Sequence, residues 1–342
     1  MKILLIRMMG FGDVASILIP AVKIYRQQFP EAKISVLTYG PGNELMTLVP
    51  GVDAVLTVSK EQWPNDIQPA IESFIGIAKV VLEQRYEKIV NFDTWFMPCF
   101  LARFLKDLGQ DIVGNYINLS ISEFHEKLTS LEMNQAYFQN PGNYLASNFP
   151  NMPDWIIPWW DKFPEAGAYP EFYLNHCCGF KEIVDISLDI QEDPDFKLIA
   201  KERRIIAVSA SGSKANKNYP FRDKLIEQLE KQGFFVWGKF DGSVPMEKTL
   251  GRLKVTDLLI TVATSTQWLA KLVGCPSLML PGSLPPSVLG SELVVDKKLE
   301  CQYCYQNYCP EAIDFACMEI PIDVVVAKVL DYFAVKSGKK LI

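Results

Sequence analysis

The sequence predicts an α/β protein made of two doubly wound, parallel-sheet lobes in tandem. Its 342 residues suit two domains, because single domains commonly run about 100–200 residues. Short unbroken apolar runs alternate with segments of helical periodicity, which is typical of βαβ units. This alternation stops near residue 151 and restarts near residue 203. We therefore expect domains at residues 1–165 and 166–342.

The first lobe begins with an unbroken apolar strand. Such runs suit a parallel sheet that is covered on both faces. From Val14 onward apolar residues recur at helical spacing, and Pro20 either kinks that helix or marks its first turn. We expect strands at residues 2–7, 33–39, 51–58 and 88–92, a helix from residue 14, and a helix over 71–84.

The second lobe follows a segment, residues 151–173, that is rich in aromatic residues and proline. That segment has neither helical nor strand periodicity, so we expect it to connect the lobes. The final segment, residues 322–335, is amphipathic and predicts a C-terminal helix. The other expected elements are strands at 203–210, 234–238, 257–263 and 276–282 and helices at 223–233 and 266–274.

Composition and charge exclude several classes of protein. The net charge is −6, which argues against nucleic-acid binding as the main function, since that requires a basic surface. The first apolar run ends at Arg7 and is too short for a signal peptide. No run reaches the roughly 18 apolar residues that span a bilayer. We expect a cytoplasmic protein without a transmembrane segment.

The loop RMMGFGDV follows the first strand and contains Gly10, Gly12 and Asp13. The dinucleotide fingerprint G-x-G-x-x-G contains a third glycine, which this loop lacks. An aspartate in the loop also repels phosphate. Two interpretations of Asp13 remain: it caps the following helix, or it is a functional carboxylate at the carboxyl end of a strand, where open α/β sheets place their sites.

Three motifs together resemble glycosyltransferase family 9, the ADP-heptose:lipopolysaccharide heptosyltransferases and their relatives. IRMMGFGDV, followed by PA five residues later, is similar to the N-terminal signature of that family. SGSKANKNYPF (211–221) resembles its K-x-W-P donor segment, with Lys217 on the lysine and Tyr219 on the tryptophan. ATSTQWLAKLVGCPSLMLPG (263–282) resembles the segment that begins D-T-G-x-x-H.

The resemblance implies a fold of the GT-B type, with two Rossmann-like domains facing across a cleft. It implies an inverting transfer, without a catalytic metal, from a nucleotide sugar such as ADP-heptose to a hydroxyl of a glycan or lipopolysaccharide-type acceptor. The N-terminal domain would bind the acceptor beside Gly10 and Gly12, with Asp13 as general base. A lipid-linked acceptor would bring the protein to the inner membrane face.

The C-terminal domain would bind the nucleotide sugar. The resemblance places Lys217 on the diphosphate, next to Ser211 and Gly212. Of the D-T-G-x-x-H segment only Thr264 is kept, with Ala263, Ser265 and Trp268 at the other three positions. Ser265 and Thr266 still offer donors to a phosphate at the start of a helix. The changes leave two alternatives open, another nucleotide sugar or a degenerate transferase that acts as a scaffold.

Asp241 follows the strand FFVWG and ends a Rossmann-type strand. It is either a ligand of a ribose hydroxyl or a solvated turn residue in Asp-Gly. Two further functional alternatives remain for the whole chain: a glycosyltransferase with a protein acceptor, and a nucleotide-dependent oxidoreductase that uses the first glycine loop. The missing third glycine counts against the oxidoreductase.

Four cysteines near the C-terminus have the spacing C-x2-C-x4-C-x7-C, at Cys301, Cys304, Cys309 and Cys317. Four thiolates at short spacing predict a structural tetrahedral site for zinc or iron. The alternative is a loop of free thiols or a disulfide-stapled loop. Some family 9 members carry a similar cysteine-rich segment, and a subset that modifies autotransporter proteins uses cysteines to hold iron. Four cysteine ligands would leave no open position for catalysis.

Overall fold

The structure, a computed structural model, describes residues 1–130, 132–212, 217–306, 308–310 and 314–336. The chain divides into two compact units, Met1–Ile186 and Ser187–Ile342. The boundary expected at residue 165 falls inside the first unit. The reason lies in the aromatic segment, which packs into the first unit instead of connecting the two.

The aromatic segment folds as a series of short helical turns. Phe172 and Tyr173 are fully buried, and the Phe172 ring stacks on Trp159 with centroids 4.0 Å apart. The Tyr173 hydroxyl donates a hydrogen bond to the carbonyl of Phe92, 2.6 Å away, at the end of a central strand. The aromatic residues therefore complete the core of the first unit. The turns are η2 (Met152–Ile156), α9 (Trp159–Lys162), η3 (Pro164–Ala166), α10 (Tyr169–Glu171) and η4 (Phe172–Cys177).

The first unit contains a six-stranded sheet in the order β3-β2-β1-β4-β5-β6. Five strands are parallel, and the short edge strand β6 is antiparallel to β5. The strands expected near residues 2–7, 33–39, 51–58 and 88–92 are all present, while β5 and β6 were not predicted. The strands are β1 (Lys2–Ile6), β2 (Lys33–Tyr39), β3 (Ala54–Val58), β4 (Lys88–Asn91), β5 (Ile112–Ile117) and β6 (Leu145–Ser147).

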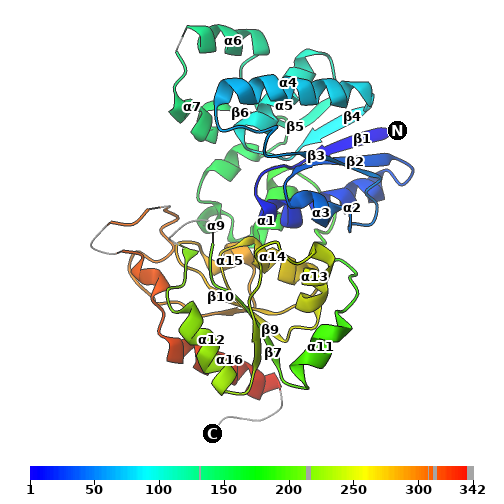
Figure 1. Cartoon of the computed structure of the whole chain (residues 1–342). Helices are drawn as coiled ribbons and strands as arrows, with labels where there is room; N and C mark the ends of the chain where they lie inside the picture. The colour runs from blue at the N-terminus through cyan, green and yellow to red at the C-terminus, as the bar shows by residue number, and fades with distance from the viewer. Residues whose placement is uncertain (131, 213–216, 307, 311–313, 337–342) are drawn as a thin grey trace. The chain divides into compact units, whose positions relative to one another are not determined.

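Helices cover both faces of this sheet (Figure 1). On one face, Phe74 of α4 (Ile67–Glu83) and Phe100 of α5 (Phe96–Asp107) belong to one buried cluster with Leu4 and Ile6 of β1. The other face carries α2 (Ile19–Gln28) and α3 (Gly42–Met46). The remaining helices of the unit are α6 (Ile121–Thr129), α7 (Gln135–Gln139) and α8 (Pro141–Tyr144).

The helix expected from residue 14 begins earlier and has three parts. It starts with one turn, α1 (Phe11–Asp13), continues as a π-helical turn, η1 (Val14–Leu18), and then becomes α2. Pro20 lies in α2 directly after the π-helical turn, inside one helical run that begins at Phe11. A proline inside a helix removes a backbone hydrogen bond, and a π-helical turn is one of the irregularities that accompany such a break in the ladder.

The second unit contains a five-stranded parallel sheet in the order β11-β10-β9-β7-β8. Leu225 and Leu229 of α12 and Val325 and Val329 of α16 belong to its buried core, and α13 and α14 lie on the opposite face (Figure 1). The strands are β7 (Ile205–Ser209), β8 (Phe235–Trp237), β9 (Leu258–Val262), β10 (Ser277–Leu280) and β11 (Leu293–Val294). The helices are α11 (Pro194–Ala200), α12 (Arg222–Lys231), α13 (Met246–Lys254), α14 (Ser265–Leu272), α15 (Pro286–Leu289), η6 (Ala316–Met318) and α16 (Ile322–Lys336).

Each sheet reverses its strand order at one point. In the first unit this switch point lies between β1 and β4, and in the second it lies between β7 and β9. Open α/β sheets bind ligands outside the carboxyl ends of the strands at such points. The topology therefore marks one candidate site in each unit. The longest described helix, α4, has 17 residues, and none of the helices in the described ranges could cross a bilayer.

Candidate functional site

The loop after β1 is built around Gly10. Its φ is +78°, and its carbonyl accepts hydrogen bonds from the amides of Asp13 (2.8 Å) and Val14 (3.0 Å). A Cβ at Gly10 would overlap the Asp13 carboxylate, so glycine provides both the backbone conformation and the space for that side chain. Gly12 lies within α1 without a positive φ.

Asp13 lies just before the buried turn η1 and makes no capping hydrogen bond with its side chain. Its carboxylate instead contacts Arg7, with 3.0 Å between Arg7 Nη2 and Asp13 Oδ2. The side chain of Asp13 is 26% exposed, whereas that of Arg7 is 2% exposed. The side chain of Asp13 is therefore not a helix cap; it is a carboxylate that Arg7 holds and solvent can reach at the carboxyl end of a strand.

Asp93, which follows β4, is the second carboxylate at this switch point and is fully buried. Its Oδ2 accepts hydrogen bonds from the amides of Met8 (2.7 Å) and Met9 (3.0 Å), and its Oδ1 accepts one from the amide of Trp95 (3.0 Å). Arg7 Nη1 lies 3.9 Å from Asp93 Oδ1 and donates to the carbonyl of Phe92 at 2.7 Å. One buried carboxylate therefore ties the loop after β1 to the loop after β4.

Arg7 lies between the two carboxylates. Burial disfavours its charge, but the negative charges of Asp13 and Asp93 outweigh burial and hold the pKa of Arg7 well above its usual value. The guanidinium also lies over the Tyr173 ring, 5.8 Å from the centroid. Asn115 supports this arrangement from β5, because its Nδ2 donates to the Asp93 carbonyl (3.0 Å) and to the Tyr173 hydroxyl (3.1 Å).

Trp95 is an exposed aromatic residue beside these charges. It is 52% exposed, while its neighbours Asp93, Thr94, Phe96 and Met97 are all buried. The amide of Trp95 is held by Asp93, so its position is fixed relative to the Asp13 loop. Aromatic faces of this kind offer a stacking surface to a sugar ring or another flat apolar face.

Sequence reasoning missed Arg7, Asp93, Asn115 and Trp95. Arg7 is the first residue of the quoted loop RMMGFGDV, but no role was predicted for it. Asp93 follows the predicted strand at 88–92, and a search for acidic residues directly after predicted strands would have found it. Asn115 had no such signal, because β5 itself was not predicted.

The second switch point brings part of the expected donor segment together. The Ser209 hydroxyl, at the end of β7, donates to Thr266 Oγ1 in the first turn of α14 at 2.9 Å. Thr264 is the N-cap of α14, yet its side chain makes no capping hydrogen bond. The N-terminus of α14 therefore lies at the carboxyl ends of β7 and β9, the arrangement that favours an anion. Ser265 is half-buried there.

Lys217 lies after the segment that follows β7. Ser211 is exposed and Gly212 half-buried, and the Gly212 amide donates to Asn218 Oδ1 at 3.0 Å. A Cβ at Gly212 would come within 2.6 Å of Lys217 Cβ, so this glycine allows the lysine to approach closely. Residues 213–216 of the same motif lie outside the described residues.

Two positions of the family motifs have become core residues. Tyr219, at the tryptophan position, is 3% exposed and donates from its hydroxyl to the Ile320 carbonyl at 2.8 Å. Trp268, at the histidine position, is 5% exposed. Tyr219 belongs to the buried core cluster of the second unit, and Trp268 is buried as well.

Asp241 forms a turn of its own. Its Oδ1 accepts hydrogen bonds from the Ser243 amide (3.0 Å) and the Ser243 hydroxyl (2.6 Å). These hydrogen bonds lower the pKa of Asp241 below its usual value. The contacts match the solvated-turn interpretation, and a ribose contact would have to use the remaining carboxylate oxygen.

Solved structures share this two-unit architecture over almost the whole chain. A glycosyltransferase family 9 protein from Veillonella parvula superposes with a TM-score of 0.63 at 13% identity, covering 96% of both chains. ADP-heptose lipopolysaccharide heptosyltransferase II from E. coli gives 0.61 at 13% identity, covering 99% of this chain and 100% of that one. The fold is of the GT-B type. The expected fold class is thereby confirmed, with the one antiparallel strand β6 as a correction.

A third GT-B structure, the iron-containing dodecameric glycosyltransferase TibC from enterotoxigenic E. coli, gives a TM-score of 0.55 at 11% identity. It is matched over 97% of this chain and 77% of its own. No protein-family model matches the sequence, and no curated protein matches it by sequence. The likeness therefore rests on the backbone.

The expected tetrahedral site is not assembled among the described residues of the cysteine segment. Cys301 and Cys304 are exposed, Cys309 and Cys317 are half-buried, and all four are free thiols. Among the residues described, no group of three or more histidine, cysteine or acidic side chains is placed to hold a metal ion. Burial raises the pKa of Cys317, and the other three cysteines raise it further. Residues 307 and 311–313 of this segment are outside the described ranges.

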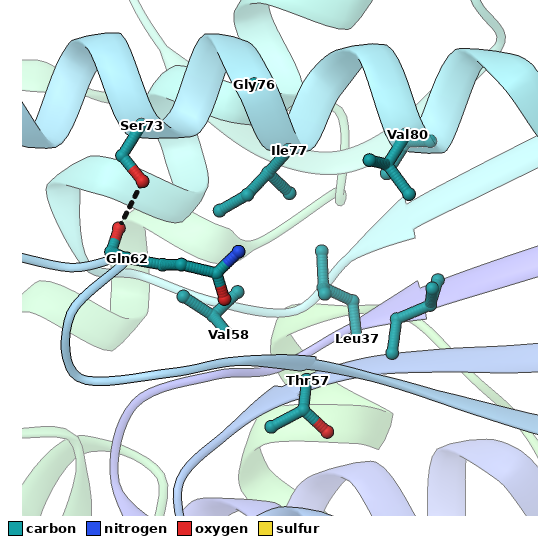
Figure 2. Close-up of a pocket in the computed structure, with 10 residues that line it drawn as sticks. Leu37, Thr57, Val58, Gln62, Ser73, Gly76, Ile77 and Val80 are labelled. Carbon is teal, nitrogen blue, oxygen red and sulfur yellow. Dashed lines mark hydrogen bonds between the residues drawn. The ribbon is translucent and has the colours of Figure 1, made fainter.

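An apolar pocket opens between α4 and the edge of the first sheet, with a volume of about 170 Å³. Figure 2 shows Ile77 and Val80 of α4 above Leu37 and Val58 of β2 and β3. The Ser73 hydroxyl donates to the Gln62 carbonyl at its rim, 2.6 Å away. The lining contains no titratable side chain, so this pocket lacks the groups that transfer chemistry needs.

Proposed function

We propose that the protein is an inverting glycosyltransferase. It would move a sugar, heptose or a related one, from a nucleotide-sugar donor to a hydroxyl of a glycan or lipid-linked acceptor. The observation that carries this proposal is the Asp13 carboxylate, which is held by Arg7, a quarter exposed, and located at the switch point of the first sheet. A carboxylate in that setting suits a general base that acts on a bound hydroxyl.

In the proposed step, Asp13 takes the proton of the acceptor hydroxyl while the oxygen of that hydroxyl attacks the anomeric carbon of the donor sugar. A new carbon–oxygen bond forms on one face of the sugar, and the bond to the diphosphate oxygen breaks on the opposite face. The nucleoside diphosphate leaves with the electron pair. Its developing charge would be stabilised by Lys217 and by the N-terminus of α14 at Thr264–Thr266, next to Ser211 and Gly212.

One observation supports a nucleotide sugar as the donor, and another supports a sugar-containing acceptor. Heptosyltransferase WaaC from E. coli, a structure of similar fold, has been solved with ADP and with ADP-2-deoxy-2-fluoro heptose, which makes an adenosine diphosphate sugar the first donor to test. On the acceptor side, Trp95 is exposed and its backbone amide is held by Asp93, so its ring is a candidate stacking face for a sugar. We assign acceptor binding to the first unit and donor binding to the second.

The test is sugar transfer by Asp13→Asn, assayed with a panel of nucleotide sugars and with glycan and protein acceptors. Asparagine keeps the size but cannot take the proton, so we expect kcat to fall about 10²–10⁴-fold. Asp111→Asn is the matched control, because Asp111 is an exposed carboxylate of the same unit, paired with Lys88. Full turnover by Asp13→Asn, or no turnover of any donor by the wild type, would contradict the proposal.

A second candidate is a scaffold that keeps the fold without turnover. The observation that favours it is the loss of the acidic and imidazole groups at Ala263 and Trp268, both now buried. Calorimetry with ADP and with nucleotide sugars separates the candidates. Donor binding with no transfer and no donor hydrolysis would favour the scaffold. The four cysteines take no part in the proposed transfer.

A further inference from the structure

We propose that Arg7 and Asp93 are positioning residues for Asp13, and that the buried Asp93 carboxylate orients both the Asp13 loop and the Arg7 guanidinium. This inference rests on the proposed role of Asp13 as base. Neither residue reaches solvent, since Asp93 is fully buried and Arg7 is 1% exposed. Their effect on an acceptor must therefore pass through Asp13.

The contacts of Asp93 explain how it positions the loop. Its Oδ2 accepts two consecutive amides, those of Met8 and Met9, which fix the backbone between β1 and Gly10. Its Oδ1 lies 3.9 Å from Arg7 Nη1. A carboxylate accepts hydrogen bonds only, so Asp93 can accept from three amides, including that of Trp95, and still face a cation. Asparagine would present a donor to one of these partners.

The contacts of Arg7 explain how it positions the carboxylate. One terminal nitrogen donates to the Phe92 carbonyl, and the other contacts Asp13 Oδ2 at 3.0 Å. The rigid planar fork of a guanidinium fixes both partners in one geometry, which a lysine ammonium cannot do. Arg7 therefore sets the direction of the Asp13 carboxylate as well as its electrostatic environment.

The charge balance at this point is one cation and two carboxylates. The other titratable groups within electrostatic reach of Arg7 are Tyr169 and Tyr173, both from the aromatic segment, with Cys99 near Asp93 and Cys178 near Arg7. Burial raises the pKa values of Tyr173, Cys99 and Cys178, so these three are neutral in the working range. Arg7 is then the group that offsets the repulsion between Asp13 and Asp93.

The experiment compares Arg7→Gln, Arg7→Lys and the double variant Arg7→Gln/Asp93→Asn with the wild type. Arg7→Gln leaves the Asp93 carboxylate buried without its cation, which destabilises the fold. The double variant removes both buried charges and is assayed in its place if Arg7→Gln does not fold. Arg103→Gln is the matched control, because it breaks an arginine–aspartate pair of α5 in the same unit. Each variant is measured for kcat and donor KM and for thermal unfolding.

For Arg7→Gln we expect kcat to fall about 10–100-fold with donor KM changed less than about 2-fold, because a transition-state interaction is lost. Arg7→Lys keeps the charge but not the planar fork, so its kcat should lie between those of Arg7→Gln and the wild type. The double variant should resemble Arg7→Gln in kcat.

A second readout does not depend on activity. In protein labelled with ¹³C at aspartate carboxyls and studied at one neutral pH, we expect the Asp13 signal to shift in Arg7→Gln and to stay at its wild-type position in Arg103→Gln, because only the first variant removes the Arg7 contact. If that signal moves but no form of the protein transfers sugar, the proposed function fails and the positioning role stands. If Asp13→Asn is inactive while Arg7→Gln keeps the wild-type kcat and carboxyl signal, the positioning role is wrong.

Discussion

At the scale of single residues, Gly10 and Asp13 depend on each other. Gly10 has a left-handed backbone, and the volume that its missing side chain leaves is filled by the Asp13 carboxylate. In the loop RMMGFGDV the space beside Gly10 is therefore occupied by a carboxylate. Gly10 lets the chain turn beneath a carboxylate that Arg7 holds from the other side.

We expect Gly10→Ala to cost both stability and activity. The positive φ costs about 1 kcal/mol for alanine, and the methyl group must also displace Asp13. Gly109→Ala is the control, because Gly109 has a similar φ of +85° but no atom within 4 Å of its added Cβ. Urea unfolding should show that Gly10→Ala is destabilised at least as much as Gly109→Ala. Transfer assays should show a loss of turnover in Gly10→Ala only. Equal activity of the two variants would contradict this account.

At the scale of single elements, α4 shows how a helix covers a sheet and still leaves a gap. Phe74, Ile77 and Val81 of α4 are buried against the sheet, while Gly76 lines the apolar pocket and meets no atom within 4 Å of an added Cβ. Glycine in a helix interior is unfavourable by about 0.5–1 kcal/mol relative to alanine. No contact described here explains why glycine stands at this position.

We therefore expect Gly76→Ala to raise the free energy of unfolding by about 0.5–1 kcal/mol, from helix propensity alone. Gly251→Ala in α13 is the opposite case, because its Cβ would approach the Gln191 carbonyl oxygen to 2.7 Å, and it should destabilise. Urea unfolding of both variants, followed by circular dichroism, checks the pair. If the free energy of unfolding instead falls in Gly76→Ala, the added methyl group is not accommodated in the pocket and the prediction is wrong.

At the scale of the whole molecule, buried tyrosines and cysteines make stability depend on alkaline pH. Burial raises the pKa of Tyr219 to about 12 and that of Cys275 to about 12. Burial likewise raises the pKa values of Tyr25, Tyr144 and Tyr173. In the unfolded chain these groups ionise near their ordinary values of about 10 for tyrosine and 8.5 for cysteine.

The free energy of unfolding should therefore begin to fall near pH 8, where cysteines of the unfolded chain ionise, and fall more steeply above about pH 9–10, where its tyrosines ionise. In that range the unfolded chain releases protons that the folded protein keeps, so stability is lost as pH rises toward the folded pKa values. Each buried tyrosine should cost about 1 kcal/mol by about pH 10.5. Urea unfolding between pH 7.5 and 10.5 measures the slope, and Tyr219→Phe should make it shallower. A flat or rising slope would contradict the prediction.

The sequence predicted most strands because each is a local run of buried apolar residues. It missed β5, whose run is broken by Gly114 and by the buried Asn115, and it missed β6 and β11, which have three and two residues. The boundary at residue 165 was also misplaced, because an aromatic segment without periodicity gives no indication of which core it fills. Whether these short segments pair as strands, and which core the aromatic segment fills, depends on packing partners far along the chain.

By itself the sequence determined the α/β class, the two-part organisation and the special position of the loop that contains Gly10 and Asp13. These features are local, since they depend on periodicity, turn chemistry and short motifs. Only the tertiary structure placed Arg7 between Asp13 and Asp93, since Arg7 and Asp93 are 80-odd residues apart in the chain and meet because β1 and β4 are neighbours in the sheet. It also placed Tyr219 and Trp268 in the core. Charge pairing and burial depend on which strands lie side by side, and parallel pairing joins segments that no local pattern links.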